Sequence, residues 1–232
     1  MLGYCAKLEQ NNDRAWFHAN HDEYVQARED FIELTDRMRF AVAEETGPEL
    51  AERLLFVDPK DLLFRIPRDM RVWKNAPPYN PSWRCYLAAD RKAVLPVGYF
   101  CMIAPGDRSH FGTGGWCSDR DFLRSVRQFI SDHVEEFEDA LEQGGYPLSE
   151  TEGKLKRVPL GFDPDDPAGE YLKYKEWYVS ERFADAELTD ADSFLDRVRQ
   201  AVRRMEPLRR FFDRAFSQKP RKPWEGAWDE TP

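Results

Sequence analysis

Apolar residues recur every three or four positions along three long stretches of the chain, which is the spacing of one buried helix face. The stretches are residues 22–45, 119–143 and 194–216. We expect a long helix in each, although Pro207 should kink or divide the third because proline cannot donate a backbone hydrogen bond. A shorter helical pattern over residues 4–20 is broken at Asn11-Asn12-Asp13, where the side chains suit a helix cap.

The middle of the chain changes to patterns that are typical of strands. Strands are expected over residues 62–72, 83–90, 96–104 and 177–183. Pro67 places the first at a sheet edge or a bulge, because a central strand needs every backbone donor. The third is apolar on both faces, which indicates a central strand. Pro105-Gly106 suits a type II turn, so residues 97–112 should form a hairpin.

Strands grouped in the middle and helices at either end predict an α+β fold, with a mainly antiparallel sheet of four to six strands flanked by long helices. A chain of 232 residues is comfortable as one domain. We therefore expect a single domain over residues 1–217. Residues 218–232 contain prolines and two tryptophans and are predicted to form a mobile tail.

The net charge of −9 disfavours nucleic acid as a partner. Residues 197–222 differ from the rest, with ten Lys or Arg against Glu206 and Asp213. Three interpretations stay open for this basic segment. It is a helix face whose charges are offset by acidic neighbours, which we favour, or a surface for a protein partner, or a contact with RNA.

The chain contains no run of about 20 apolar residues and no recognisable export signal, so we expect a cytoplasmic protein without a membrane span. The cysteines at 5, 85, 101 and 117 are too widely spaced for a paired zinc motif. We expect reduced, mostly buried thiols, with Cys85 and Cys101 as neighbours across a hairpin. No cofactor and no metal are expected.

The best candidate for a site is the segment from 65 to 79. Its chemical groups are Arg65, Arg68, Asp69, Arg71, Lys74 and Tyr79. On a strand, Arg65, Asp69 and Arg71 share one face, and a bulge at Pro67 would turn Arg68 toward it. Such a face suits a phosphate or carboxylate ligand. The alternative is a structural Arg–Asp network that ties an edge strand to its neighbours.

Two further segments add candidate ligand-binding groups. Gly114 and Gly115 end a glycine-rich run before a predicted helix, where free backbone N–H groups bind anions, although turn glycines at the end of a hairpin are the favoured explanation. A capping box is expected at Ser118 and Asp121. Lys156 and Arg157 lie on a third segment. We expect the arginines, glycine amides and this basic pair to converge on one cleft.

Three residues are candidates for acid–base catalysis. Asp69 and Tyr79 lie within the arginine segment, and His110 titrates in the useful range. The acidic run at Asp163, Asp165 and Asp166 is interpreted as a proline-rich turn in preference to a cation site.

The arginine segment also supports a family resemblance. It has the form R-x-x-R-D-x-R followed by a lysine and a Pro-Tyr pair, and residues 11–17 and 155–164 supply two more motifs in order. Over residues 4–216 the chain resembles the family called domain of unknown function 2461 (DUF2461), as a divergent member. Val72 stands where the family usually has phenylalanine, and Ala76 and Asn80 stand where lysines are common. The resemblance implies no particular reaction.

The leading hypothesis is a protein with a cleft that binds phosphate or carboxylate, extended to an enzyme that acts on a small anionic metabolite. The alternative is a non-catalytic interaction module that uses the basic segment and the tail, residues 197–232, to bind a protein partner.

Overall fold

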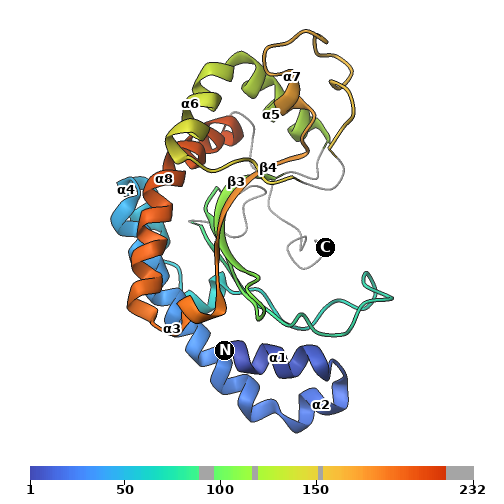
Figure 1. The fold of residues 1–232 in the computed structure, drawn as a ribbon, viewed down its shortest axis with the longest axis vertical. Helices are drawn as coiled ribbons and strands as arrows, with labels where there is room; N and C mark the ends of the chain where they lie inside the picture. The colour runs from blue at the N-terminus through green and yellow to red at the C-terminus, as the bar shows by residue number, and fades with distance from the viewer. Residues whose placement is uncertain (89–96, 117–119, 151–153, 218–232) are drawn as a thin grey trace.

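A four-stranded antiparallel sheet organises the chain (Figure 1), and the computed structural model describes residues 1–88, 97–116, 120–150 and 154–217. Across the sheet the strands are β1 (Trp83–Leu87), β2 (Tyr99–Ile103), β3 (Ser109–Trp116) and β4 (Glu176–Phe183). The predicted hairpin is confirmed by β2 and β3. Gly106 has a φ of 76°, as the third position of a type II turn requires. The predicted end of the second strand, and Ser118, lie outside the described residues.

Helices cover one face of the sheet and both of its ends. They are α1 (Leu2–Gln10), α2 (Arg14–Ala19), α3 (His21–Glu45), α4 (Pro48–Leu55), α5 (Arg120–Asp132), α6 (Val134–Gly144), α7 (Gly169–Leu172) and α8 (Ala191–Ser217). Figure 1 shows α3 and α8 side by side along the sheet, α1 and α2 at one end, and α5, α6 and α7 at the other. This arrangement confirms the α+β class.

The residues at the helix ends explain one accurate prediction from the sequence pattern and two inaccurate ones. Asp13 caps α2 by accepting a hydrogen bond from the backbone N–H of Trp16, at 2.9 Å. The predicted helix over 119–143 is two helices, because His133 leaves the helical conformation between α5 and α6. Gly47-Pro48 does more than end α3, since Pro48 also occupies the first turn of α4, which the pattern did not predict.

Pro207 does not divide α8, which is one helix from Ala191 to Ser217. Figure 1 shows that its direction changes between its orange and red parts. Aromatic packing holds the helix on both sides of the proline. Before it, Phe194 packs on Phe183 of β4, with ring centroids 5.0 Å apart, and after it Phe211 and Phe212 are packed. Phe212 packs on Trp177 of β4, with ring centroids 6.1 Å apart, and Phe211 packs on Phe137 of α6, at 5.1 Å.

A buried charge joins α8 to the sheet. Glu206 is only 7% exposed, and its carboxylate accepts hydrogen bonds from Tyr99 Oη at 2.7 Å, Arg209 Nε at 2.7 Å and Arg210 Nε at 3.0 Å. Burial opposes ionisation, but the hydrogen bonds from Arg209, Tyr99 and Arg210 outweigh it and lower the pKa of Glu206. The carboxylate is therefore ionised and fully bonded inside the core.

Replacing Glu206 by Gln should destabilise the fold by about 3–5 kcal/mol, because the buried Arg209 loses its nearest counter-charge and keeps only Asp213, at 3.8 Å. Urea denaturation at neutral pH measures this loss. The stabilisation from ionised Glu206 is fully present above its ordinary pKa of 4.5 and is lost as pH falls through the lowered pKa of the folded state. The difference in free energy of unfolding between the wild type and the variant should therefore decrease in acid. Glu23→Gln, which breaks an exposed pair with Lys7, is the control and should cost at most about 1 kcal/mol. Equal losses in the two variants would contradict the role of Glu206.

Candidate functional site

The arginine segment does not form a strand. Only isolated bridges join Leu63 to Cys85 and Pro67 to Tyr79, and residues 70–72 form a turn. The N–H of Arg68 donates to Pro78 O at 2.9 Å, and the N–H of Asn80 donates to Ile66 O at 2.8 Å. Residues 63–80 are therefore an irregular ribbon beside β1, in which residues 63–64 bond to the outer edge of the strand and residues 69–77 form the tip. The edge position was predicted correctly, but the alternation of side chains between two faces was not.

Arg68 braces this ribbon from within. Its Nη1 donates to Pro77 O at 2.7 Å and to Tyr79 O, so the guanidinium is used by the backbone. Asn12 completes the brace, because its amide accepts from Tyr79 N at 3.0 Å and donates to Tyr79 O at 2.9 Å. The ring of Tyr79 is stacked on Phe17 at 4.1 Å. These contacts, which we call the Tyr79 clamp, give Arg68 and Tyr79 structural positions.

The other groups of the segment do not gather around one ligand position. Asp69 is bound by Arg71, whose Nε lies 2.9 Å from Asp69 Oδ1. The hydrogen bonds from Arg71 lower the pKa of Asp69 to about 2, so the carboxylate is a poor proton acceptor at neutral pH. Lys74 is exposed at the tip, and Arg65 accepts a hydrogen bond from Arg84 Nη2 through its carbonyl, at 3.1 Å.

The predicted convergence of three segments is not observed. Gly114 and Gly115 lie within β3, opposite Tyr178 and Trp177 of β4, and not in a loop before a helix. The strand continues through the glycines to Trp116, so their backbone is part of the sheet. Residues 156–157 lie between α6 and α7, at the opposite end of the molecule from the ribbon tip (Figure 1).

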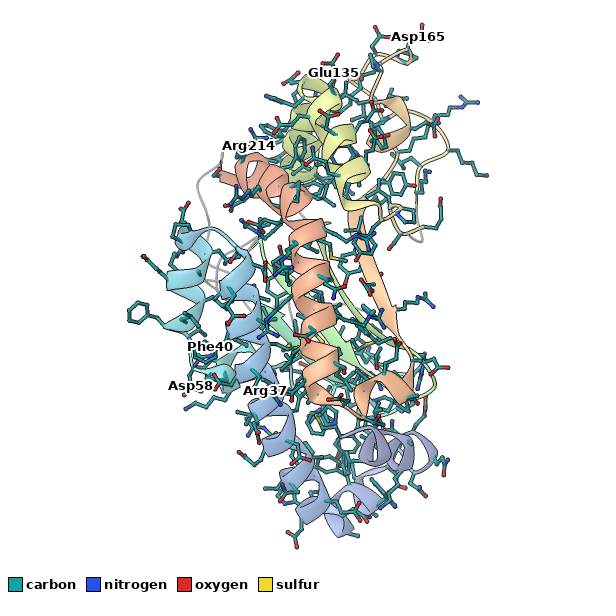
Figure 2. All side chains as sticks on the ribbon, turned by 60° about the vertical axis from the view of Figure 1, so that its left-hand side comes forward. Arg37, Phe40, Asp58, Glu135, Asp165 and Arg214 are labelled. Atoms are coloured by element: carbon teal, nitrogen blue, oxygen red, sulfur yellow. The ribbon has the colours of Figure 1, made fainter. Side chains whose placement is uncertain are left out.

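The acidic run is a turn, as interpreted from the sequence. Asp163 accepts a hydrogen bond from Asp165 N at 2.9 Å, and Asp166 accepts one from Ala168 N at 2.7 Å. Figure 2 shows Asp165 at the outer tip of its loop, pointing away from the body of the molecule. Across the described ranges, no group of three His, Cys, Asp or Glu residues is arranged to hold a metal ion.

The structure brings other residues together on the face of the sheet opposite α3 and α8. We call it the helix-free face, because none of the helices in the described ranges packs on it (Figure 1). Its side chains are those of Arg84, Tyr86, Phe100, Met102, His110, Tyr178, Ser180 and Arg182, together with the backbone of Gly112 and Gly114. The opposite face carries the buried core, including Tyr99, Phe111 and Trp177.

One row crosses all four strands of the helix-free face. The strand register places Arg84 of β1 beside Met102 of β2, Met102 beside His110 of β3, and His110 beside Arg182 of β4. We call these four residues the cross-strand row. His110 was predicted as a site residue, whereas Arg84 and Arg182 were not. Arg84 is the one charged residue of β1, whereas Arg182 follows Ser180 and Glu181 in β4, and only the pairing register shows that the two arginines align.

His110 is held in an orientation that leaves one ring nitrogen for a ligand. Its Nδ1 lies 3.2 Å from the carbonyl oxygen of Arg108, a bond that requires a proton on Nδ1. Burial and the nearby charge of Arg182 lower the pKa of His110, so the imidazole is neutral at neutral pH. Nε2 is then a hydrogen-bond acceptor.

Aromatic side chains adjoin the row. The ring centroid of Phe100 lies 5.6 Å from that of His110 and 5.9 Å from that of Phe64. The ring of Tyr178 lies across Gly112, where a Cβ atom would be 2.5 Å from Tyr178 Oη, so only glycine fits. Tyr178 Oη is enclosed and has no hydrogen-bond partner among the residues that the structure describes.

A hollow of about 720 Å³ lies between α6 and α8, away from the helix-free face. Its arginines are already paired: Arg203 with Glu45, Arg210 with Glu206 at 3.0 Å, and Arg214, labelled in Figure 2, with Glu136. The described part of the basic segment therefore follows the favoured interpretation, in which acidic neighbours offset its charges. This hollow holds no surplus positive charge for an anion.

The thiols are buried. Cys5, Cys85 and Cys101 are free, and Cys85 lies directly opposite Cys101 in the register of β1 and β2, which confirms the predicted proximity. Cys117 falls outside the described residues. The interaction with Cys85, together with burial, raises the pKa of Cys101, so its thiol is protonated and unreactive.

The Tyr79 clamp predicts different costs for neighbouring arginines. Arg68→Gln should lower the free energy of unfolding by about 1–3 kcal/mol, because two backbone carbonyls lose a charged donor. Arg71→Gln should change it by less than about 1 kcal/mol, since that side chain is 90% exposed. Urea denaturation distinguishes them, and a loss for Arg71→Gln as large as that for Arg68→Gln would contradict the clamp.

Comparisons with known proteins identify the family alone. No curated protein and no solved structure matches the chain. None of the helices in the described ranges is both long and apolar enough to cross a membrane. Residues 1–211 match the family described as conserved hypothetical protein DUF2461, and the chain therefore belongs to the DUF2461 family.

Proposed function

We propose that the protein binds a small anion, a phosphate or a carboxylate, on the helix-free face of its sheet. Arg84 and Arg182 would bind the anion, with His110 between them. The observation that supports this proposal is the cross-strand row, which aligns two arginines and a histidine on one face. The ligand class is the one expected from the sequence, but the proposed site lies on the sheet and not in the segment from 65 to 79.

The spacing of the row suits a small ligand. Neighbouring strands lie about 4.8 Å apart, so the backbones of β1 and β4 are about 14 Å apart, with Met102 and His110 between them. Arg84 and Arg182 stand at opposite ends of the row, and Arg84 Nη2 donates to Arg65 O at 3.1 Å, so Arg84 would have to turn from the ribbon toward the middle of the row to bind a ligand together with Arg182. Their planar forks match the oxygen geometry of carboxylate and phosphate.

The local charge balance favours an anion. Glu181 is the acid nearest to Arg182 in sequence, but its side chain lies on the opposite face and is bonded to Arg197 of α8. Glu176 shares the helix-free face but stands six residues from Arg182 along β4, about 20 Å away. Within the described strands, the row itself contains no carboxylate.

His110 would give the site a group for acid–base catalysis, so we extend the proposal from a binding protein to an enzyme. A neutral imidazole with an accepting Nε2 can take a proton from a bound substrate at neutral pH. The substrate class would be a small phosphorylated or carboxylated metabolite. Asp69 and Tyr79 have no part in this proposal, because one is neutralised by Arg71 and the other is held in the Tyr79 clamp. The alternative of a protein partner for residues 197–232 stays a prediction.

The anion site is tested by removing both arginines of the row. Arg84→Gln with Arg182→Gln should weaken sulfate binding at least about tenfold, because each lost charged hydrogen bond costs about 1.5–3 kcal/mol. Sulfate titration followed by NMR shifts measures the affinity. The control, Arg71→Gln with Arg157→Gln, changes the net charge equally with exposed arginines elsewhere. An equal loss in the control, or no sulfate binding by the wild type, would overturn the site.

A second test uses pH. Sulfate keeps its charge from about pH 5 to about pH 8, whereas His110 gains a proton only as pH falls through its lowered pKa, below its ordinary value of 6.5. Sulfate affinity should therefore rise as the solution is made acidic, because a third positive charge joins the row. His110→Gln should remove most of this rise while leaving the affinity at neutral pH nearly unchanged. A rise that persists in the variant would exclude His110 from the site.

A further inference from the structure

We propose that the hollow between α6 and α8 binds an organic amine, in which a primary ammonium group is attached to a small apolar body. This site is separate from the anion site on the helix-free face and does not rest on it. Its volume of about 720 Å³ lies within the range of small-molecule sites. Three features of the hollow support this ligand: a carboxylate outside the ion pairs, a backbone carbonyl that lacks its usual donor, and an apolar floor.

The charges in the hollow leave one carboxylate over. Each of the three arginines of the lining is paired with an acid of the lining. Arg209, which is outside the lining and also bonds to Glu206, has Asp213 at 3.8 Å as a second acid. Asp139 of α6 is the remaining acid of the lining, and within the described ranges it forms no ion pair. An exposed carboxylate at the side of a hollow attracts a cation.

Pro207 supplies the second feature. A helical residue normally donates its N–H to the carbonyl oxygen four positions earlier, but proline has no N–H. Pro207 therefore leaves Arg203 O without this donor, in the part of α8 where the helix changes direction (Figure 1). Positions four apart lie on one helix face, and both residues line the hollow, so this carbonyl lies on the side of the hollow.

The packing of α6 on α8 places Asp139 beside the proline. Two contacts bracket the hollow along the two antiparallel helices. At one end Arg204 Nε donates to Gly144 O at 2.9 Å, and at the other Phe211 packs on Phe137, with ring centroids 5.1 Å apart. Asp139 lies between these contacts on α6, as the proline does on α8. An ammonium group has three N–H donors, so it can bond to the carboxylate and to the freed carbonyl together.

Apolar side chains form the floor of the hollow. Ala140 of α6 and Pro207 and Phe211 of α8 belong to its lining. A hydrocarbon body attached to the ammonium group would bury its surface on them, and this burial adds affinity. A bare metal ion or ammonium ion would not use this floor. The combination therefore favours an amine with an apolar body.

Three probes that share one aromatic body separate these features. Benzylamine carries a charged group with three N–H donors, benzyltrimethylammonium carries the same charge without an N–H, and benzyl alcohol is neutral. At neutral pH the full-length protein should bind benzylamine at least about tenfold more tightly than benzyl alcohol, because only the cation makes charged hydrogen bonds. Benzyltrimethylammonium should lie between the two. NMR titration measures the three affinities.

The contribution of the carboxylate is tested by Asp139→Asn. This variant should remove most of the preference for both cations and leave the binding of benzyl alcohol unchanged, which a general loss of structure would not produce. Glu142→Gln is the control, because it removes an equal charge from an exposed position of the same helix outside the lining. A preference for benzylamine that survives in Asp139→Asn, or that falls equally in the control, would overturn the amine site.

The contribution of the carbonyl is tested by Pro207→Ala, because alanine restores the N–H that bonds to Arg203 O. Benzylamine should bind this variant about fivefold more weakly, whereas benzyltrimethylammonium, which has no N–H, should bind as it does to the wild type. An equal loss for both cations would overturn the role of the carbonyl. If the wild type binds benzylamine no more tightly than benzyl alcohol, the whole inference is overturned, and sulfate binding on the helix-free face is unaffected by that result.

Discussion

The fold depends on neutralising one charge inside the core. α8 can lie along the sheet only if the carboxylate of Glu206, which faces Tyr99, finds hydrogen-bond donors inside the core. Arg209 and Arg210 of the same helix donate these bonds in place of water. Beyond this charge, Phe212 of the same helix packs on both Trp177 of β4 and Phe137 of α6. Pro207 is tolerated inside the helix because this packing, and not the ladder of helix hydrogen bonds alone, fixes its position.

Covering the sheet from one side has a direct effect on the other side. The helices of the described ranges at both ends reach past the sheet but do not close over its second face, so side chains that would be core residues in a three-layer fold stay half-buried. A sheet with one covered face normally carries scattered polar residues on the other. Here two of them are arginines at opposite edges of one row, and this regularity is what supports a binding role over simple solvation.

The sequence predicted the positions of helices and strands better than the contacts between side chains. The 3.6-residue repeat located α3 and α8 because both bury a continuous apolar face, but it could not reveal the break at His133, since α5 and α6 each keep the same repeat. The glycine run predicts a loop because glycine is frequent in loops. In β3, however, Gly112 and Gly115 are needed because a Cβ atom there would clash with the rings of Tyr178 and Phe212. Of the predicted site residues, His110 lies in the row. Arg68 donates to backbone carbonyls, and such partners have no signature in a sequence.

The ribbon beside β1 also bears on how the protein behaves at high concentration. A strand at the edge of a sheet exposes unpaired backbone groups that can recruit the edge of another molecule. Residues 63–68 cover the edge of β1, where one isolated bridge, from Leu63 to Cys85, and a few backbone hydrogen bonds hold them. Asn12 fixes this segment indirectly, because it binds the backbone of Tyr79, the bridge partner of Pro67. A change that loosens this segment would uncover the backbone groups of β1 and favour pairing between the edges of two molecules.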